Sequence, residues 1–529
     1  MLLGLAAATA PMQASAQTAQ APQIKLLLGI VVEGLDDGSL EMLRESFGEG
    51  GFRYLYRNGV YLPQADFGTQ LDATSATALL VSGAQPALNG VDAESHFDRD
   101  RLLPVHVYAD KEAMGNFTTA AYSPSALKVS TITDELLIAG AGINSAYSVA
   151  VEPGAAIALA GHSGNVALWL DRATGNWASS TYYRDMPAAI AGRNRTRPLV
   201  ARLDTASWAP LEDPGKYVGL PEHLSRYAFR YVFPRSDSRR IEKFAASPLA
   251  NSEVTAVATE LLNASRVGSA EEGIDALQLG YSLVTYPYGR SADRRLEQQD
   301  AYLRLDRSIE QLFNAIDRTV GLDHTLIYLA GTPAPPQTPR DDPKWRVPAG
   351  EFSTRRAASL LNIYLMAIHG NGDYVAGFHG GRLYLNQRLL KERNLDIEAV
   401  SSDAAAFLRR MTGVDRAYTA GDIAAGRAGE NAMSLRRNTF MPTAPEVTLV
   451  VAPGFEIVAD FESPGTGADT PRYTRRAGSS AAPFFIVAPQ LEARRIDVPA
   501  DARAIAPTVA RVLRIRSPNG AETMPISLR

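Results

Sequence analysis

The chain has 529 residues, of which 46% are hydrophobic and 21% charged, a composition typical of a globular protein and not of a disordered one. Its 53 basic and 57 acidic residues give a formal net charge of −4, which provides no electrostatic reason to expect nucleic-acid binding. The absence of cysteine excludes disulfides, thiolate zinc sites, thiol catalysis and a lipid anchor on cysteine.

The first residues are typical of a secretory signal. The stretch 2–8 is apolar, and Ala14–Ser15–Ala16 before Gln17 fits a small-x-small cleavage site. A basic leading segment is missing, which suggests a start codon upstream of Met1; a disordered Ala-rich tail is the alternative. We predict a signal peptide at 1–16, a mature domain at 17–529, and export to the periplasm or the outer envelope. No other stretch approaches about 18 apolar residues, so we expect no transmembrane span.

Strand and helix signals alternate along the mature chain. We predict strands at 26–32, 146–151, 325–330 and 484–487, and helices at 40–55, 75–81, 131–137, 298–320 and 505–513. The pattern is clearest at 298–320, where apolar residues recur at spacings of three and four. Along the chain a strand is followed by this helix and then by another strand. That order predicts a βαβ unit in a parallel sheet. Loops are expected at 176–250 and 333–357, the second because it contains Pro333, Pro335, Pro336 and Pro339.

Several short segments occur in an order and spacing that identify a fold. They are 26–32, Gly50–Gly51–Phe52, Ser82–Gly83 with Pro86, Asn89–Gly90, Phe97–Asp98–Arg99, 161–165, 300–306, and 505–508 with 518–520. Together they resemble the alkaline phosphatase superfamily and, within it, the bacterial PafA-type branch. The resemblance implies an α/β fold, a three-layer sandwich with a largely parallel central sheet. It also implies cap insertions at roughly 95–250 and 335–440.

Members of this family hydrolyse phosphate esters with two zinc ions and a Thr or Ser nucleophile, so the resemblance implies motifs rich in Asp and His. At the first motif positions this chain has residues other than those of the family. Glu33 stands where the family has an Asp ligand, and Ala73 stands at the nucleophile. Thr74 is one residue away, which is about 100° around a helix. Glu94 replaces a phosphate-binding Asn, where a carboxylate would repel a phosphoryl group.

The later motif positions differ as well. Glu152 and Gly154 match the Lys and Arg that stabilise the transferring phosphoryl group in the PafA branch. The second metal motif falls on Thr285 and Gly289, and the next Asp-His pair falls on Thr332 and Pro333. The final zinc-binding His of the family should lie in the last quarter of the chain, but no His follows position 379.

These substitutions lead to a first hypothesis, a catalytically inactive member of the superfamily. Such a pseudoenzyme would act as a binding or scaffold component of the bacterial cell envelope, with protein partners, without nucleic acid, and with no metal or other cofactor. No catalytic residue is then expected. The region that corresponds to the family's active site would be a vestigial pocket. It would be marked by Glu33, Ala73, Thr74, Glu94, Glu152, Thr285 and Thr332.

Two alternatives remain open. The first is an active phosphate- or sulfate-ester hydrolase with a rebuilt site, using Thr74 or Ser75 as nucleophile. Zinc would be held by Glu33, Asp36, Asp72 and Glu94, although Asp36–Asp37–Gly38 is also a typical turn and Asp72 a typical helix cap.

The second alternative is a small-ligand-binding module that uses the old cleft. A sugar or nucleobase site would be lined by Trp169, Trp177, Tyr182 and Tyr183. Aromatic residues at such spacing are more often core, and His162 is more often a structural histidine than a ligand.

Overall fold

The computed structural model describes residues 23–69, 71–226, 228–269, 272–289, 293–333, 350–452, 454–458, 472–473 and 480–528. The predicted signal peptide at 1–16 lies outside these residues, as do three prolines of the predicted second loop, Pro335, Pro336 and Pro339.

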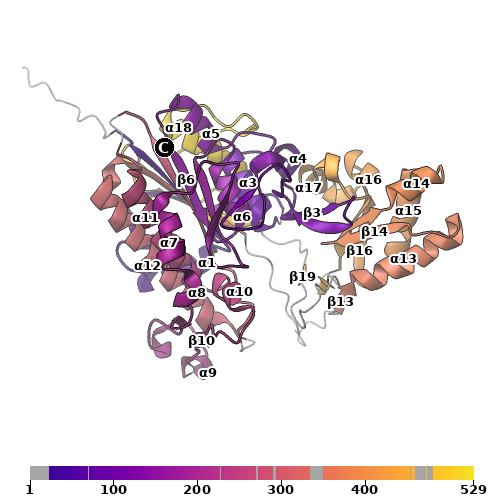
Figure 1. Ribbon diagram of the computed structural model, residues 1–529, viewed down its shortest axis with the longest axis horizontal. Helices are drawn as coiled ribbons and strands as arrows, with labels where there is room; N and C mark the ends of the chain where they lie inside the picture. The colour runs from indigo at the N-terminus through magenta and orange to yellow at the C-terminus, as the bar shows by residue number, and fades with distance from the viewer. Residues whose placement is uncertain are drawn as a thin grey trace, which may run out of the picture.

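A central β-sheet organises the molecule (Figure 1), and in the described ranges it has eleven strands. Their spatial order is β21 (Arg494–Arg495), β2 (Val60–Asp66), β20 (Ala481–Val487), β12 (Thr325–Thr332), β1 (Leu26–Glu33), β11 (Asp275–Ser282), β6 (Ala146–Ala150), β7 (Val166–Leu170), β8 (Trp177–Ser180) and β5 (Gly115–Asn116), with β22 (Ala500–Asp501) beside β2. The five strands from β12 to β7 are mutually parallel. The remaining strands pair antiparallel with their inner neighbours, apart from β21 and β22, which run parallel to β2. The largely parallel sheet predicted from the sequence is therefore confirmed.

Helices cover both faces of this sheet because its strands are apolar on both faces. Along β1, Leu28 and Ile30 join one hydrophobic cluster while Leu27 and Val31 join the other. The first cluster includes α1 (Asp37–Leu43), α2 (Phe52–Asn58), α11 (Leu249–Ser265) and α12 (Arg295–Thr319). The second includes α3 (Ala73–Ser82), α5 (Ile132–Ala139), α6 (Pro153–Ala160) and α18 (Ile505–Leu513). The result is the predicted three-layer sandwich.

The predicted helix at 40–55 is instead two helices, and α12 is the reason. Asp306 on α12 accepts hydrogen bonds from the backbone N–H groups of Gly48 and Phe52, each at 2.7 Å. A side chain at Gly51 would overlap the Asp306 carboxylate. The chain therefore leaves the helical path between α1 and α2 so that this glycine-rich turn can bind Asp306.

The predicted loop at 176–250 contains several short elements. They are β8, α7 (Ala188–Thr196), α8 (Leu199–Arg202), β9 (Ser207–Trp208), α9 (Glu222–Ser225), β10 (Tyr231–Val232), α10 (Arg240–Ala245) and the start of α11. Pro187, Pro198, Pro221 and Pro248 directly precede α7, α8, α9 and α11. The prolines of this region thus mark helix starts, where a missing N–H costs nothing, and not only loops.

The predicted loop at 333–357 also ends earlier than expected. Gly350–Ser353 forms β13, and Thr354–His369 forms α13 with the Ser353 side chain as its N-cap. The last proline of the predicted range is Pro348, so the residues after it are free to form a strand and a helix.

Residues 350–458, together with 472–473, build a cap module with its own hydrophobic core. Its strands are β13, β14 (Val375–His379), β15 (Arg382–Leu385), β16 (Val414–Thr419), β17 (Val447–Val451), β18 (Phe455–Val458) and β19 (Arg472–Tyr473). Its helices are α13, α14 (Gln387–Glu392), α15 (Ile397–Leu408), α16 (Ala420–Ala424) and α17 (Ala432–Arg437). In Figure 1 this orange module lies at one end of the long axis, and the hairpin of β3 (Ser95–Asp98) and β4 (Leu103–His106) lies between it and the sheet, near α4 (Pro86–Asn89).

The insertion ranges expected from the sequence differ from these elements in two ways. The cap module continues beyond residue 440 because β17 and β18 complete its two small sheets. The range 95–250 includes β6, β7 and β8, which belong to the central sheet. Among the helices that the structure describes, none is long and apolar enough to cross a membrane.

Candidate functional site

The carboxyl ends of β1, β11 and β12 meet at one edge of the sheet, which we call the carboxyl edge. Glu33 at the end of β1 is in register with Ser282 on β11 and with Thr332 on β12. The Ser282 side chain lowers the pKa of Glu33 and so opposes the effect of burial. The Thr332 hydroxyl is fully buried and has no hydrogen-bond partner within the described part of the chain. In open α/β sheets this edge is where ligands usually bind.

Carboxyl groups from three other segments, those of Asp72, Glu94 and Glu152, lie close enough to Glu33 for their charges to act on one another. Glu152 is the N-cap residue of α6, and Glu94 precedes β3. Burial raises the pKa of Glu33 to about 7, with Glu152 as the next cause. Burial likewise raises the pKa of Glu94 to about 7, followed by the charges of Asp72, Glu152 and Glu33. The carboxyl edge is therefore acidic, and burial favours the protonated form of two of its acids.

Arg172 is the cation of this group, and the sequence analysis did not single it out. Its guanidinium forms an ion pair with Glu152, and that charge raises the pKa of Arg172. The sequence contains an indication of this contact in the positions of the two residues after neighbouring strands. Glu152 follows β6 and Arg172 follows β7, and these parallel neighbours end at the same edge.

The position expected for the nucleophile has no reactive group. Ala73 is the first residue of α3, and Thr74 beside it is buried, with 6% of its surface exposed. A side chain at Gly154 would overlap the Thr74 hydroxyl, so Thr74 packs against the first turn of α6. The absence of a side chain at residue 154 is therefore what makes room for Thr74.

Two of the acids considered as alternative zinc ligands, Asp72 and Asp36, use their carboxylates to cap helices. Asp72 caps α3, accepting from the Ser75 N–H at 2.9 Å and, through its other oxygen, from the Glu94 N–H at 2.9 Å. This confirms the interpretation of Asp72 as a cap. Asp36 caps α1 and accepts from the Ser39 N–H at 2.8 Å, so the expected turn at Asp36–Gly38 is a helix start. The Ser75 hydroxyl is buried and has no partner among the described residues.

The second metal-motif position is packed with protein groups. The Thr285 hydroxyl donates to Gln298 Oε1 on α12 at 3.4 Å. The Arg294 guanidinium donates to the Gly289 carbonyl, and a side chain at Gly289 would overlap it. An arginine thus lies over the position that a zinc-binding motif would occupy, and Pro333 directly follows β12. In the described ranges, no cluster of three or more His, Asp or Glu side chains is arranged to hold a metal ion.

The aromatic residues considered for a ligand site are mainly core. Trp169, Trp177 and Tyr183 are buried, and only Tyr182 is well exposed, at 44%. His162 has structural partners: its Nδ1 lies 3.1 Å from the Asp134 carboxylate and its Nε2 lies 3.2 Å from the Leu127 carbonyl oxygen. The interpretation of His162 as a structural histidine is confirmed.

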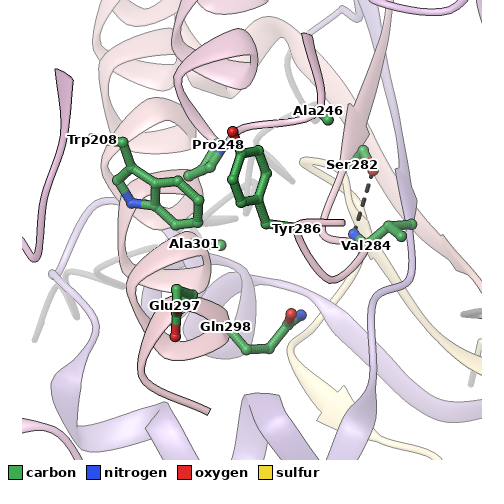
Figure 2. Close-up of a pocket in the computed structure, with 9 residues that line it drawn as sticks. All are labelled: Trp208, Ala246, Pro248, Ser282, Val284, Tyr286, Glu297, Gln298 and Ala301. Atoms are coloured by element: carbon green, nitrogen blue, oxygen red, sulfur yellow. Dashed lines mark hydrogen bonds between the residues drawn. The ribbon is translucent and has the colours of Figure 1, made fainter. Parts of the chain in front are cut away.

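A small cavity borders the carboxyl edge through Ser282 (Figure 2). It is lined by Trp208, Ala246, Pro248, Ser282, Val284, Tyr286, Glu297, Gln298 and Ala301. Its volume is about 10 Å³, which is room for about one water molecule. One carboxylate oxygen of Glu297 is buried there with no hydrogen-bond partner in the described residues. The cavity suits a single water and is too small for a phosphate ester.

Comparisons with known proteins agree with this fold. No family model matches the chain. It is 23% identical over 530 residues to alkaline phosphatase PafA of Elizabethkingia meningoseptica, covering 97% of this chain and 95% of that protein. It is 24% identical over 524 residues, 95% of this chain and 94% of the relative, to a Myroides odoratus protein named calcium-transporting ATPase. Alkaline phosphatase PhoV of Synechococcus elongatus is 27% identical over 337 residues, 60% of this chain and 61% of its own length.

Solved structures show the same architecture. Wild-type alkaline phosphatase PafA superposes with a TM-score of 0.80 at 21% identity, covering 96% of this chain and 99% of PafA. A substituted variant of PafA gives a TM-score of 0.81 over the same shares of the two chains. The likeness extends over nearly the whole of both chains, including the cap module.

Proposed function

Because this chain belongs to the alkaline phosphatase superfamily as a PafA-like member, yet carries carboxylates at its carboxyl edge, we propose that it is a non-hydrolytic member that acts by binding. In this proposal the chain is exported and serves as a scaffold or binding component of the bacterial cell envelope. It uses no metal or other cofactor.

The convergence of Glu33, Glu94 and Glu152 is the observation that carries this proposal. A phosphoryl group is an anion, and its transfer requires cations or hydrogen-bond donors around the phosphoryl oxygens. Here the nearby cation, Arg172, is already paired with Glu152. A phosphate ester entering this edge would therefore meet net negative charge where it needs positive charge.

The size of the catalytic task supports the same conclusion. Hydrolysis of phosphate monoesters needs acceleration of up to about 10²¹-fold, and two metal ions supply several kcal/mol of it in this type of site. Ala73 offers no nucleophile, and Thr74 is buried against Gly154. Useful turnover would require both a rebuilt nucleophile and a rebuilt metal site.

Metal analysis and a phosphatase assay test the proposal directly. We expect the purified protein to contain no stoichiometric zinc and to leave p-nitrophenyl phosphate unhydrolysed, with or without added zinc. Stoichiometric zinc together with turnover that Thr74→Ala abolishes would overturn the proposal. Gly154→Arg provides a second check. Restoring a cation there should not create activity, because Thr74 must then move and both metal motifs are still changed.

An active hydrolase is the second candidate, and the relatives support it. Two of them carry the name alkaline phosphatase, and the similarity to PafA covers almost the full chain. In that case Thr74 or Ser75 would be the nucleophile, with Glu33 and Glu94 as ligands. The zinc and turnover measurements above separate the two candidates, since only the hydrolase needs the metal.

The scaffold role predicts stable partners. Affinity purification from the native envelope should recover this chain with other envelope proteins. Recovery of the chain alone, with bound zinc, would contradict the scaffold role and support the hydrolase.

A further inference from the structure

A short segment, Asp92–Arg99, makes several close contacts with the cap module. At its start, the Asp92 carboxylate accepts from Arg382 of β15 at 2.9 Å and from the Phe440 N–H at 2.9 Å. The side chains of Arg382 and Asp92 are only 8% and 4% exposed. A buried ion pair of this kind is costly to break, because each partner would be left as an unpaired buried charge.

The other end of the segment is held in the same manner. Arg99 pairs with Glu446 at 2.9 Å and donates to the Ala444 carbonyl at 3.2 Å. Phe97 stacks on Tyr384 with ring centroids 4.8 Å apart, and a side chain at Gly377 would overlap the Phe97 ring. The segment is thus fixed to the cap module at both ends by ion pairs and in the middle by a stacked ring.

Between these two ends lies a histidine that bridges the same two parts. His379, the last residue of β14, has its Nε2 atom 2.7 Å from the Ser95 hydroxyl of β3. It is paired in register with Arg382 on β15, which places the imidazole next to the buried guanidinium. His379 is 9% exposed, so water screens this neighbourhood poorly.

Among the described residues, the charged groups near His379 favour its neutral form. Burial lowers its pKa to about 4, and the charges of Arg382 and His96 act in the same direction. His96 in turn faces Asp92, Asp98 and Arg382, and burial lowers its pKa as well. His379 is therefore neutral and hydrogen-bonded to Ser95 at neutral pH, and a proton added to it would place a second positive charge beside Arg382.

We propose that His379, Ser95 and Arg382 form an acid-sensitive latch that holds the cap module on the sandwich and releases it when His379 is protonated. The direction of the pH dependence follows from the pKa of His379 in the released state and in the closed state. In the released state His379 is exposed and takes up a proton near its ordinary pKa of 6.5, whereas in the closed state it does so near 4. The closed state is therefore fully favoured above pH 6.5, and its advantage falls, by roughly 10²-fold, as the pH drops from 6.5 to 4.

The absence of cysteine makes a direct test possible. Asn58→Cys on the sandwich and Ile363→Cys on the cap module give a pair of exposed, specifically labelled positions for fluorescence energy transfer. We expect the transfer efficiency to change reversibly between pH 7 and pH 4 while the far-UV circular dichroism stays constant. His379→Gln keeps an acceptor for Ser95 but cannot be charged, so it should abolish the change.

His324→Gln is the matched control, because His324 directly precedes β12 outside the junction and its loss should leave the response intact. An unchanged transfer efficiency down to pH 4, or a change that persists in His379→Gln, would overturn the latch. Hydrogen exchange of the unsubstituted protein provides a readout that does not depend on any variant. The segments 92–99 and 375–385 should lose protection together at pH 4.5, and continued protection of both would also overturn the latch.

Discussion

Gly29, in the middle of β1, allows two neighbouring strands to bond to each other across it. Tyr328 on β12 donates to Gln278 on β11 at 2.7 Å, and a side chain at Gly29 would overlap both groups. Gly29→Ala should therefore lower the free energy of unfolding by about 2–4 kcal/mol, through overpacking and loss of this buried hydrogen bond. Urea denaturation measures the change.

Gly192 provides the control for this substitution. It lies inside α7, and a methyl group there would meet open space. Gly192→Ala should leave the stability unchanged or raise it by up to about 1 kcal/mol, because alanine favours the helix. Equal stability of Gly29→Ala and the parent protein would contradict the close approach of Tyr328 and Gln278.

Glu33 should make the protein less stable at alkaline pH. Its folded-state pKa of about 7 lies above the ordinary value of 4.5, so the folded protein binds more protons than the unfolded chain between these values. The contribution of Glu33 to stability is then greatest below pH 4.5 and falls as the pH rises through 7. Glu33→Gln should remove this loss and stabilise the protein at pH 8 by about 1–3 kcal/mol, with little effect at pH 4. Urea denaturation at both pH values checks the sign.

Glu49→Gln is the comparison for the pH experiment. Glu49 is exposed, and its pKa is lowered by Arg57 and Arg53. This substitution should give no gain at pH 8. If Glu33→Gln behaved in the same way, the buried and crowded environment of Glu33 would be contradicted.

At the scale of single residues, the sequence revealed those parts of the carboxyl edge that follow recognisable strands. Glu33 ends an apolar run, and the acid Asp72 precedes a helix, so both positions could be predicted. Arg172 was missed because it belongs to no motif and its importance depends on Glu152, which is 20 residues away in sequence. Thr74 was recognised, but its burial against Gly154 depends on the packing of α3 on α6, which no local pattern encodes.

Among the elements, α12 connects the sandwich to the segment around β9 through one buried acid. Asp300 accepts from Trp208 Nε1 at 2.5 Å, the Leu211 N–H at 2.6 Å and the Tyr217 hydroxyl at 2.7 Å, and pairs with Arg304 at 2.7 Å. Asp300→Ala should cost about 3–5 kcal/mol, because it leaves the Arg304 charge uncompensated and several donors unpaired. It should also expose the segment 205–220 to limited proteolysis.

Gln311→Ala, an exposed position on the same helix, should change neither stability nor cleavage. If Asp300→Ala unfolded no more easily than Gln311→Ala, the Asp300 contacts would not anchor this segment.

Long helices with one apolar face and fully buried strands could be predicted from the sequence. Short helices could not. The helix α12 and the strands β1 and β12 were recognised because their apolar patterns extend over eight residues or more. The helices α7, α8 and α9 are short, and their apolar pattern is weak. They are held by contacts with the rest of the fold, and the prolines before them are equally typical of loops.

For the whole molecule, the cap module has a hydrophobic core separate from the two cores of the sandwich. Two bodies with separate cores should unfold in separate steps. Differential scanning calorimetry should therefore resolve two transitions. The substitution Leu361→Ala, in the core of the cap module, should shift only one of them. A single transition that Leu361→Ala shifts as a whole would show that the two bodies unfold as one unit.

The extent of the cap module could not be read from the sequence. Its strand β17 is apolar in the same way as β20 of the central sheet, and nothing in either stretch tells which core it joins. The overall architecture was predictable because ordered segments along the whole chain resemble one family. The boundaries within it depend on which distant residues pack together.

The position of β20 has a consequence for how the chain folds. β20 lies between β12 and β2, and β21 and β22, the other strands beside β2, also come from the C-terminal end of the chain. β2 is synthesised early, but every strand that pairs with it in the described sheet comes from the C-terminal end of the chain. β2 can therefore form its strand pairs only after that last segment has been synthesised. Such long-range pairing slows folding, because a long loop must close before any contact forms. The final segment thus sets the moment at which the sheet closes, and until then β2 has no partner strand within the described sheet.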